Sequence, residues 1–286
     1  MSKDRIKSGY SYTTTWFWRF TRAFKAALFP HRCFGCDSFF SPRKPYRTKR
    51  DVAGISDRID HFKHLIAPFL CPLCCNSIML LRSPFCRICG MPFESQTGDD
   101  HTCGVCIQSP KRFDLARSCG YYENGLKDLI HWFKYRKVPQ LAQPLGALLA
   151  WGFLKYFKDQ SIDVIIPVPL HPKRMRSRGF NQAYLLACAA IKDKVKQTHL
   201  LTRPDIAVKT LIRIRPTPPQ TGLGRELRHK NIRNAFAVTH FELIKDKSIL
   251  LVDDVYTTGA TVNECARMLK NAGAGQVSVL SLARAV

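Results

Sequence analysis

Hydrophobic residues from position 111 onward fall into two patterns with different periods. An apolar run without in–out alternation lies at 249–252, and largely apolar stretches of similar length lie at 163–170 and 277–282. Apolar residues recur every three or four positions at 126–133, 141–149, 184–195 and 262–269. The first pattern is typical of strands buried on both faces of a sheet, and the second of amphipathic helices. Because strands and helices alternate, we expect an α/β fold: a mostly parallel sheet with flanking helices.

Three shorter strands complete the prediction. Residues 119–122 are expected to form an edge strand, and residues 211–215 and 235–238 two further strands. Between the last two lies a polar stretch rich in turn residues, 216–231. A loop of this length between two strands is typical of a functional lid or of a disordered segment.

One block, Ile249-Leu-Leu-Val-Asp-Asp-Val-Tyr-Thr-Thr-Gly-Ala-Thr261, carries the strongest chemical signal. It predicts a strand, a turn and the start of a helix. Free N–H groups and the helix dipole at such a start attract phosphate, and Gly259 permits a close approach. Asp253 and Asp254 leave the strand at its carboxyl end, the edge where open α/β sheets bind ligands. Adjacent carboxylates and phosphate donors suit a phosphorylated sugar.

A second phosphate site is predicted after the strand at 163–170. The stretch from His171 to Gln182 holds four cations within eight residues, before a glycine and a helix start. The Lys134-Tyr-Arg136 cluster between two predicted helices could join this phosphate site or contact nucleic acid.

The formal net charge of +24 points to polyanionic ligands. The 286 residues include 45 Lys and Arg against 21 Asp and Glu. From Ile165 to Arg233, 15 basic residues stand against 3 acidic ones, so the excess surrounds the predicted site. Such a charge attracts nucleic acid, anionic lipid or a pyrophosphate-bearing substrate, although a basic surface also serves solubility alone. A run of about 18 apolar residues is missing, which argues against a membrane span.

Eight of the 12 cysteines form four Cys-x-x-Cys pairs: Cys33 and Cys36, Cys71 and Cys74, Cys86 and Cys89, Cys103 and Cys106. Two such pairs complete a closed Cys₄ zinc site, so we expect two structural zinc ions. No export signal is evident, which favours zinc over disulfides. We therefore predict a basic aromatic segment over 1–30, a double zinc ribbon over 31–110 with a basic insertion near 41–67, and the α/β domain over 111–286.

The block from Ile249 to Thr261 resembles the phosphoribosyl-pyrophosphate (PRPP) signature of type I phosphoribosyltransferases. The resemblance implies that Asp253 and Asp254 hold the ribose hydroxyls. It assigns the 5′-phosphate to Thr257, Thr258, Gly259, Ala260 and Thr261. Pyrophosphate, with Mg²⁺, would bind at His171, Arg174, Arg178 and Gly179. Catalytic roles would fall to Arg178 and to Gln220 and Arg225 of the long loop.

Further matches extend the resemblance over nearly the whole chain. Ile-Ile-Pro-Val-Pro-Leu-His171, Arg178-Gly-Phe-Asn-Gln182, Gln220, Arg225, Asn231 and Leu282-Ala-Arg284 occur in order behind the cysteine pairs. Together they resemble the ComF family of competence proteins. The resemblance implies a cytoplasmic protein, able to lie at the inner membrane, that acts in natural transformation with single-stranded DNA and DNA-import proteins.

Two other functions remain open. The chain could be a non-catalytic module that binds PRPP, a nucleotide or single-stranded DNA, with Trp132, Tyr135 and Phe180 offering stacking faces. It could also be a zinc-ribbon scaffold of the DNA-import machinery. Neither the acceptor base nor a general base is evident in the sequence.

Overall fold

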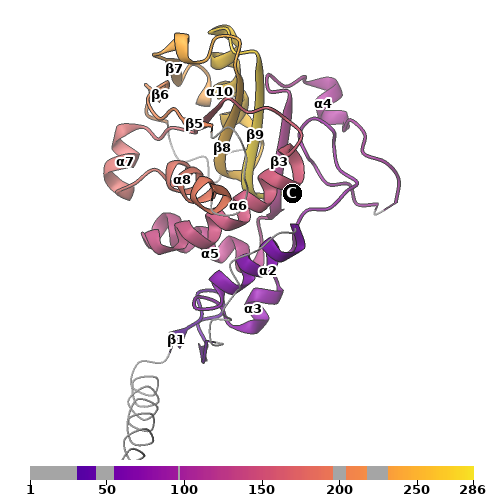
Figure 1. The fold of residues 1–286 in the computed structure, drawn as a ribbon, viewed down its shortest axis with the longest axis vertical. Helices are drawn as coiled ribbons and strands as arrows, with labels where there is room; N and C mark the ends of the chain where they lie inside the picture. The colour runs from indigo at the N-terminus through magenta and orange to yellow at the C-terminus, as the bar shows by residue number, and fades with distance from the viewer. Residues whose placement is uncertain (1–30, 43–54, 96, 196–203, 218–230) are drawn as a thin grey trace, which may run out of the picture.

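A five-stranded parallel sheet forms the centre of the molecule (Figure 1). The structure, a computed structural model, describes residues 31–42, 55–95, 97–195, 204–217 and 231–286. The strands run in the order β3 (Leu115–Tyr121), β9 (Gln276–Arg284), β8 (Ser248–Tyr256), β4 (Val164–Pro167) and β5 (Asp205–Ile206). Every neighbouring pair is parallel. The predicted fold class is confirmed, and residues 119–121 of the predicted edge strand do lie at the sheet edge, at the end of β3.

Helices cover both faces of this sheet, as Figure 1 shows: α5 (Asn124–Tyr135), α6 (Ala142–Phe157) and α8 (Gln182–Val195) on one face, and α10 (Ala260–Asn271) on the other. Strand β8 serves both layers because its successive side chains point in opposite directions. Leu250 and Val252 belong to the apolar cluster that includes α5, α6 and α8, whereas Ile249 and Leu251 belong to the cluster that includes α10. A strand buried on both faces needs the continuous apolar run seen in the sequence.

Short elements complete the carboxyl half: η1 (Pro139–Leu141), α7 (Pro172–Arg178), β6 (Leu211–Arg213), β7 (Phe236–Val238) and η2 (Phe241–Leu243). Strands β6 and β7 pair antiparallel, so both predicted strands exist but form a small sheet of their own. The region expected as a turn after the first strand contains α7, a helix with a proline at its start. The short strand β5 was not predicted.

The cysteine-rich half contributes β1 (His31–Arg32), β2 (Phe39–Phe40), α2 (Ile55–Ile66), α3 (Pro72–Asn76) and α4 (Gly104–Gln108). Helix α2 lies within the predicted insertion near 41–67, and its Phe62 and Ile66 are fully buried in the cluster shared with α6. The second half of that segment is therefore part of the fold. Residues 1–30 and 43–54 lie outside the described residues.

Strand β3 joins the two halves of the chain. The edge of β3 that faces away from β9 is hydrogen-bonded to the cysteine-rich half. The Cys119 carbonyl of β3 accepts the Leu81 N–H at 3.0 Å. In the other direction, the Tyr121 N–H donates to the Met79 carbonyl at 3.0 Å and the Ala116 N–H to the Ile88 carbonyl at 2.7 Å. These bonds cover an edge that would otherwise be exposed to pairing with other chains. Within the ranges the structure describes, no helix is both long and apolar enough to cross a bilayer.

Candidate functional site

The PRPP-like block lies where β8 turns into α10. Strand β8 ends at Tyr256 and α10 begins at Ala260, with Gly259 between them at a φ of 76°. A side chain at Gly259 would be strained by this φ and would overlap the Tyr256 hydroxyl. The turn therefore requires glycine, and it directs the first N–H groups of α10, which lack helical acceptors, toward the space beyond the strand.

Asp254 is held by a lysine from a different layer of the fold. Its carboxylate lies 2.7 Å from the Lys134 ammonium, and each side chain is only 12% exposed. Lys134 lies in the last turn of α5, after a face of buried apolar residues that packs the helix onto the sheet. Burial opposes the charge of Lys134, but the Asp254 carboxylate keeps its pKa above the ordinary value. The ion pair fixes the position of one member of the acidic pair.

Asp253, the other carboxylate, has a raised pKa. Burial, together with the adjacent Asp254 charge, raises the pKa of Asp253 to about 7, although Lys134 opposes the shift. One Asp253 oxygen accepts the backbone N–H of Asp254 at 2.8 Å. Near neutral pH the pair thus exchanges a proton readily, and a ligand that prefers two carboxylates would bind more tightly as pH rises.

The basic stretch after β4 reaches the same edge of the sheet. Strands β4 and β8 are parallel neighbours, with Pro167 opposite Val252, so the chain leaves both strands side by side. His171 caps α7 by accepting the Lys173 N–H at 3.2 Å, and Gly179 ends the helix at a φ of 85°. Partial burial and nearby cations, Arg213 first among them, lower the pKa of His171. The predicted pyrophosphate residues therefore share one short capped helix.

Two arginines form a cationic wall beside the acidic pair. Arg174 of α7 donates to the Thr217 carbonyl at 3.2 Å, and Arg213 of β6 donates to the Thr217 hydroxyl. Burial and repulsion from Arg174 lower the pKa of Arg213 to about 10, while Asp253 acts in the opposite direction. Arg213 was not a sequence candidate. Nothing in the sequence singles it out, because the Ile–Arg alternation of residues 212–215 would place Arg213 on the outward face. The structure instead buries Arg213 and exposes Ile212 and Ile214.

The aromatic candidates have different environments. Trp132 stacks on Phe34 with ring centroids 4.1 Å apart and donates to the Phe34 carbonyl at 2.8 Å, so it serves the fold. Phe180 packs on Phe133. Tyr135 is 53% exposed and carries the Arg178 guanidinium over its ring at 5.4 Å. Of the three predicted stacking faces, Tyr135 is the exposed one. Gln220 and Arg225 lie outside the described residues.

The eight paired cysteines gather into two groups, Cys33, Cys36, Cys71 and Cys74, and Cys86, Cys89, Cys103 and Cys106. Within each group all sulfur atoms lie within 4.8 Å of one another. Sulfur atoms around a tetrahedral zinc ion, with Zn–S near 2.3 Å, are about 3.8 Å apart. The observed contacts are 3.7 Å from Cys36 to Cys71 and 3.8 Å from Cys89 to Cys103.

Backbone groups around the sulfurs also fit zinc thiolates. The Cys71 N–H donates to the Cys33 sulfur at 3.2 Å, and the Cys103 N–H donates to the Cys86 sulfur at 3.3 Å. Each group could therefore hold a zinc ion. A closed set of four thiolates leaves no open position, so such ions would stabilise the fold rather than take part in chemistry.

Arg284 lies between the second cysteine group and the turn from Thr257 to Thr261, which is called the phosphate loop because the sequence predicts a phosphate there. Its guanidinium donates to the Cys89 carbonyl at 2.6 Å and lies 4.4 Å from the centre of the Tyr256 ring. Tyr256 in turn fills the space above Gly259. Arg284 is buried, with 6% of its surface exposed. The second cysteine group is thus linked to the loop by a chain of contacts: Cys89 with Arg284, Arg284 with Tyr256, and Tyr256 with Gly259.

Comparisons with known proteins agree with this geometry. Residues 208–285 match the model of the phosphoribosyl transferase domain. The chain is 32% identical to competence protein F of Haemophilus influenzae, over 78% of this chain and 93% of that one. It is also 32% identical to the DNA utilization protein YhgH of Salmonella typhimurium, over 75% and 90%. Competence protein ComFC of Bacillus subtilis matches at 28% identity, over 75% of this chain and 84% of the relative.

The domain match includes strands β8 and β9 and the acidic pair, and the relatives cover three quarters or more of the chain. The chain belongs to the ComF family, in which a cysteine-rich region precedes a phosphoribosyltransferase domain.

Proposed function

We propose that this protein binds Mg²⁺–PRPP at the carboxyl edge of β8 and β4. The observation that carries the proposal is the arrangement of Asp253 and Asp254 beside the Gly259 turn, with one carboxylate fixed by Lys134. Asp253 and Asp254 accept the ribose hydroxyls. Backbone and hydroxyl donors from Thr257 to Thr261 bind the 5′-phosphate.

The pyrophosphate group binds on the α7 side of the site. His171, Arg174, Arg178 and Gly179 are the residues assigned to it, and Arg213 adds positive charge from β6. Mg²⁺ neutralises the pyrophosphate and holds few protein ligands directly, as is usual for this ion. The donors present are phosphate-binding cations and two carboxylates, a set that fits the magnesium complex of PRPP.

The reaction class is phosphoribosyl transfer to a nitrogen nucleophile. The bond from ribose C1 to the pyrophosphate oxygen breaks as the C1–N bond forms, and the nitrogen loses a proton. Developing charge on the leaving group is stabilised by Arg178 and by Gln220 and Arg225, the residues predicted from the sequence as catalytic. Lys134 is a positioning residue, because it acts on the sugar through Asp254.

Calorimetric titration of Mg²⁺–PRPP tests this assignment. Each hydroxyl-to-carboxylate bond contributes about 1.5 kcal/mol or more, so Asp253→Asn with Asp254→Asn should weaken binding roughly 100-fold. The matched control is Asp159→Asn with Asp205→Asn, two exposed carboxylates away from the loop. Equal affinity in both double variants would refute the site.

Binding of single-stranded DNA is a second candidate function, favoured by one specific observation. Exposed Tyr135 lies beside the cations of α7, a stacking face next to phosphate-binding groups. Two of the relatives are named for competence and one for DNA utilization. If the four cations of α7 contact the strand, affinity should fall with a slope of roughly −3 against log salt concentration. An affinity that does not change with salt concentration, or that is the same in Tyr135→Ala, would exclude Tyr135 and α7 as the DNA-binding surface.

The cellular setting follows from the same chemistry. Zinc thiolates are stable in a reducing compartment, so we place the protein in the cytoplasm, where it can meet DNA-import proteins at the inner membrane.

A further inference from the structure

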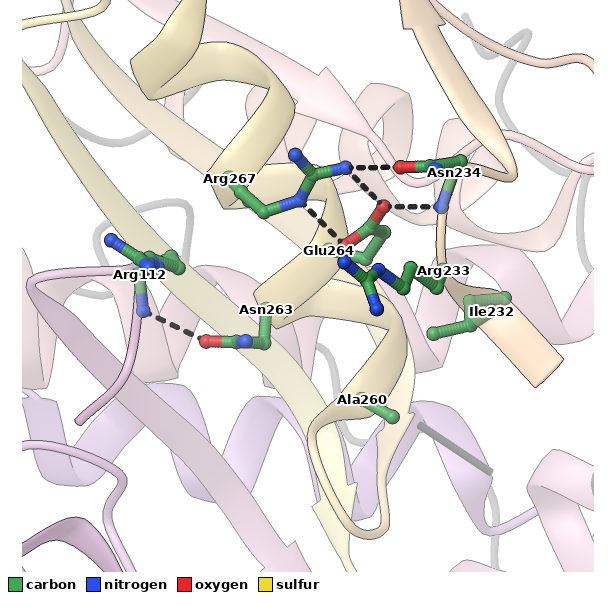
Figure 2. Close-up of a pocket in the computed structure, with 8 residues that line it drawn as sticks. All are labelled: Arg112, Ile232, Arg233, Asn234, Ala260, Asn263, Glu264 and Arg267. Atoms are coloured by element: carbon green, nitrogen blue, oxygen red, sulfur yellow. Dashed lines mark hydrogen bonds and ion pairs between the residues drawn. The ribbon is translucent and has the colours of Figure 1, made fainter. Parts of the chain in front are cut away.

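A pocket of about 490 Å³ lies along α10, and neither acidic residue lines it (Figure 2). Its size falls within the range of small-ligand sites, roughly 300–1,000 Å³. The lining residues are Arg112, Ile232, Arg233, Asn234, Ala260, Asn263, Glu264 and Arg267. They come from three parts of the chain: the start of the α/β half, the segment before β7, and α10.

A buried carboxylate fixes the walls of this pocket. Glu264 is 7% exposed, accepts the Asn234 N–H at 2.6 Å, and forms two bonds with Arg267 at 2.7 and 2.9 Å. Arg267 also donates to the Asn234 side chain at 2.8 Å. Across the pocket, the Arg112 N–H donates to the Asn263 side chain at 2.8 Å. Glu264 and Arg267 therefore neutralise each other and hold the surrounding backbone.

Two cations remain after this pairing. Figure 2 shows Arg233 extending from the segment before β7 toward α10, with Arg112 on the far side of Asn263. Both side chains are exposed, and among the described residues neither guanidinium has an ion-pair partner. The backbone beneath Arg233 is fixed, since its carbonyl accepts Arg215 at 2.7 Å. Arg112 and Arg233 both line this pocket beside the amide side chains of Asn234 and Asn263. Guanidinium groups match the planar, bidentate bonding of phosphate oxygens.

The pocket also touches the phosphate loop. Ala260 lines it and is the first residue of α10, whereas Arg267 lies two turns further, ~10 Å along the helix. We propose that this pocket is an accessory phosphate site, taking a ligand of nucleotide size that contacts Arg112 and Arg233. The phosphate comes from a free nucleotide or from the backbone of a nucleic-acid strand. The pocket shares Ala260 with the turn assigned to PRPP, but the proposal does not rest on PRPP binding.

Equilibrium binding of two probes, AMP and an oligothymidylate of ten nucleotides, tests the proposal. The variant Arg112→Ala with Arg233→Ala removes two charges from the pocket. The control, Lys245→Ala with Lys247→Ala, removes two exposed charges near the opposite end of β8. Circular dichroism confirms that both variants are folded.

We expect the pocket variant to weaken one probe at least tenfold, about 1.4 kcal/mol, while the control changes it less than twofold. If the pocket variant binds one AMP molecule per chain fewer than the parent, the pocket is a nucleotide site. If only oligothymidylate binding is lost, the pocket is a strand-binding site. Equal effects of both variants, or no effect of either, would overturn the proposal. Mg²⁺–PRPP affinity should stay within threefold in the pocket variant. If PRPP fails to bind any variant, the proposed function fails and the pocket test stands.

Discussion

Replacing Lys134 by methionine isolates the charge that fixes the acidic pair. Methionine keeps most of the length and apolar contact of the lysine stem but removes its ammonium. The 2.7 Å contact corresponds to about 6 kcal/mol at an effective dielectric constant near 20. Desolvation of the buried ammonium offsets part of this energy, which leaves a net effect of about 3 kcal/mol, or roughly two pKa units.

The expected result follows from the direction of the pKa shift. Asp253 has a pKa of about 7 with Lys134 in place, and Lys134 lowers it. About two pKa units is an upper bound for Asp253, because the 2.7 Å contact of Lys134 is with Asp254 and not with Asp253. In Lys134→Met the pKa of Asp253 should rise, so the pH at which Mg²⁺–PRPP binding is half-maximal should move upward from near 7. At pH 7 the affinity should fall by a factor of up to roughly 50, and the deficit should shrink as pH increases.

Calorimetric titration from pH 6 to pH 9 measures this shift. Lys127→Met, an exposed lysine on the same helix, is the matched control and should follow the parent profile. Lys134→Arg restores a cation and should recover most of the affinity at pH 7. A uniform loss at every pH, with the midpoint unmoved, would refute the reasoning and leave Lys134 a purely structural role.

Three other changes have defined outcomes. Asp253→Asn should raise the melting temperature at pH 8 more than at pH 4.5. Between the ordinary pKa of 3.8 and about 7 the folded parent protein binds a proton that the unfolded chain does not, so its stability falls as pH rises through that window. A variant whose melting temperature depends on pH as in the parent would contradict this. Gly259→Ala should weaken PRPP binding at least tenfold, since the added methyl group meets Tyr256 and φ is positive; calorimetry that finds parent-like affinity would show that the turn is not required. Chelation should release about two zinc ions per chain, lower the melting temperature and weaken PRPP binding through Arg284; release of one equivalent would mean that one cysteine group holds no metal.

Sequence patterns predicted the elements that carry continuous apolar runs or helical periodicity. Strands β8 and β9 were predicted because both faces are buried, so most of their positions are apolar. Helix α7 and strand β5 are short and mostly exposed, so hydrophobic periodicity carries no information about them. Helix α2 was hidden because the basic stretch before it dominates the composition of that segment.

The site shows a similar division. The strand end at Asp253 and Asp254 and the turn from Thr257 to Thr261 could be located from the sequence, because local chain geometry alone sets them. That they bind a phosphorylated sugar stays a prediction. The contacts of Lys134 and Arg213 could not be located from the sequence, because each depends on packing between elements distant in the chain. Lys134 lies 2.7 Å from a carboxylate 120 positions later, a contact set by how α5 lies against the sheet. Arg284 likewise owes its role to the placement of the second cysteine group at the sheet edge.

A crystal structure of the zinc-loaded chain with Mg²⁺–PRPP would test the central claim most directly. We expect the ribose hydroxyls against Asp253 and Asp254, the 5′-phosphate on the Thr257–Thr261 turn, and pyrophosphate facing Arg174 and Arg178. PRPP bound elsewhere, with the Lys134–Asp254 pair intact and no sugar beside it, would contradict the proposed PRPP site.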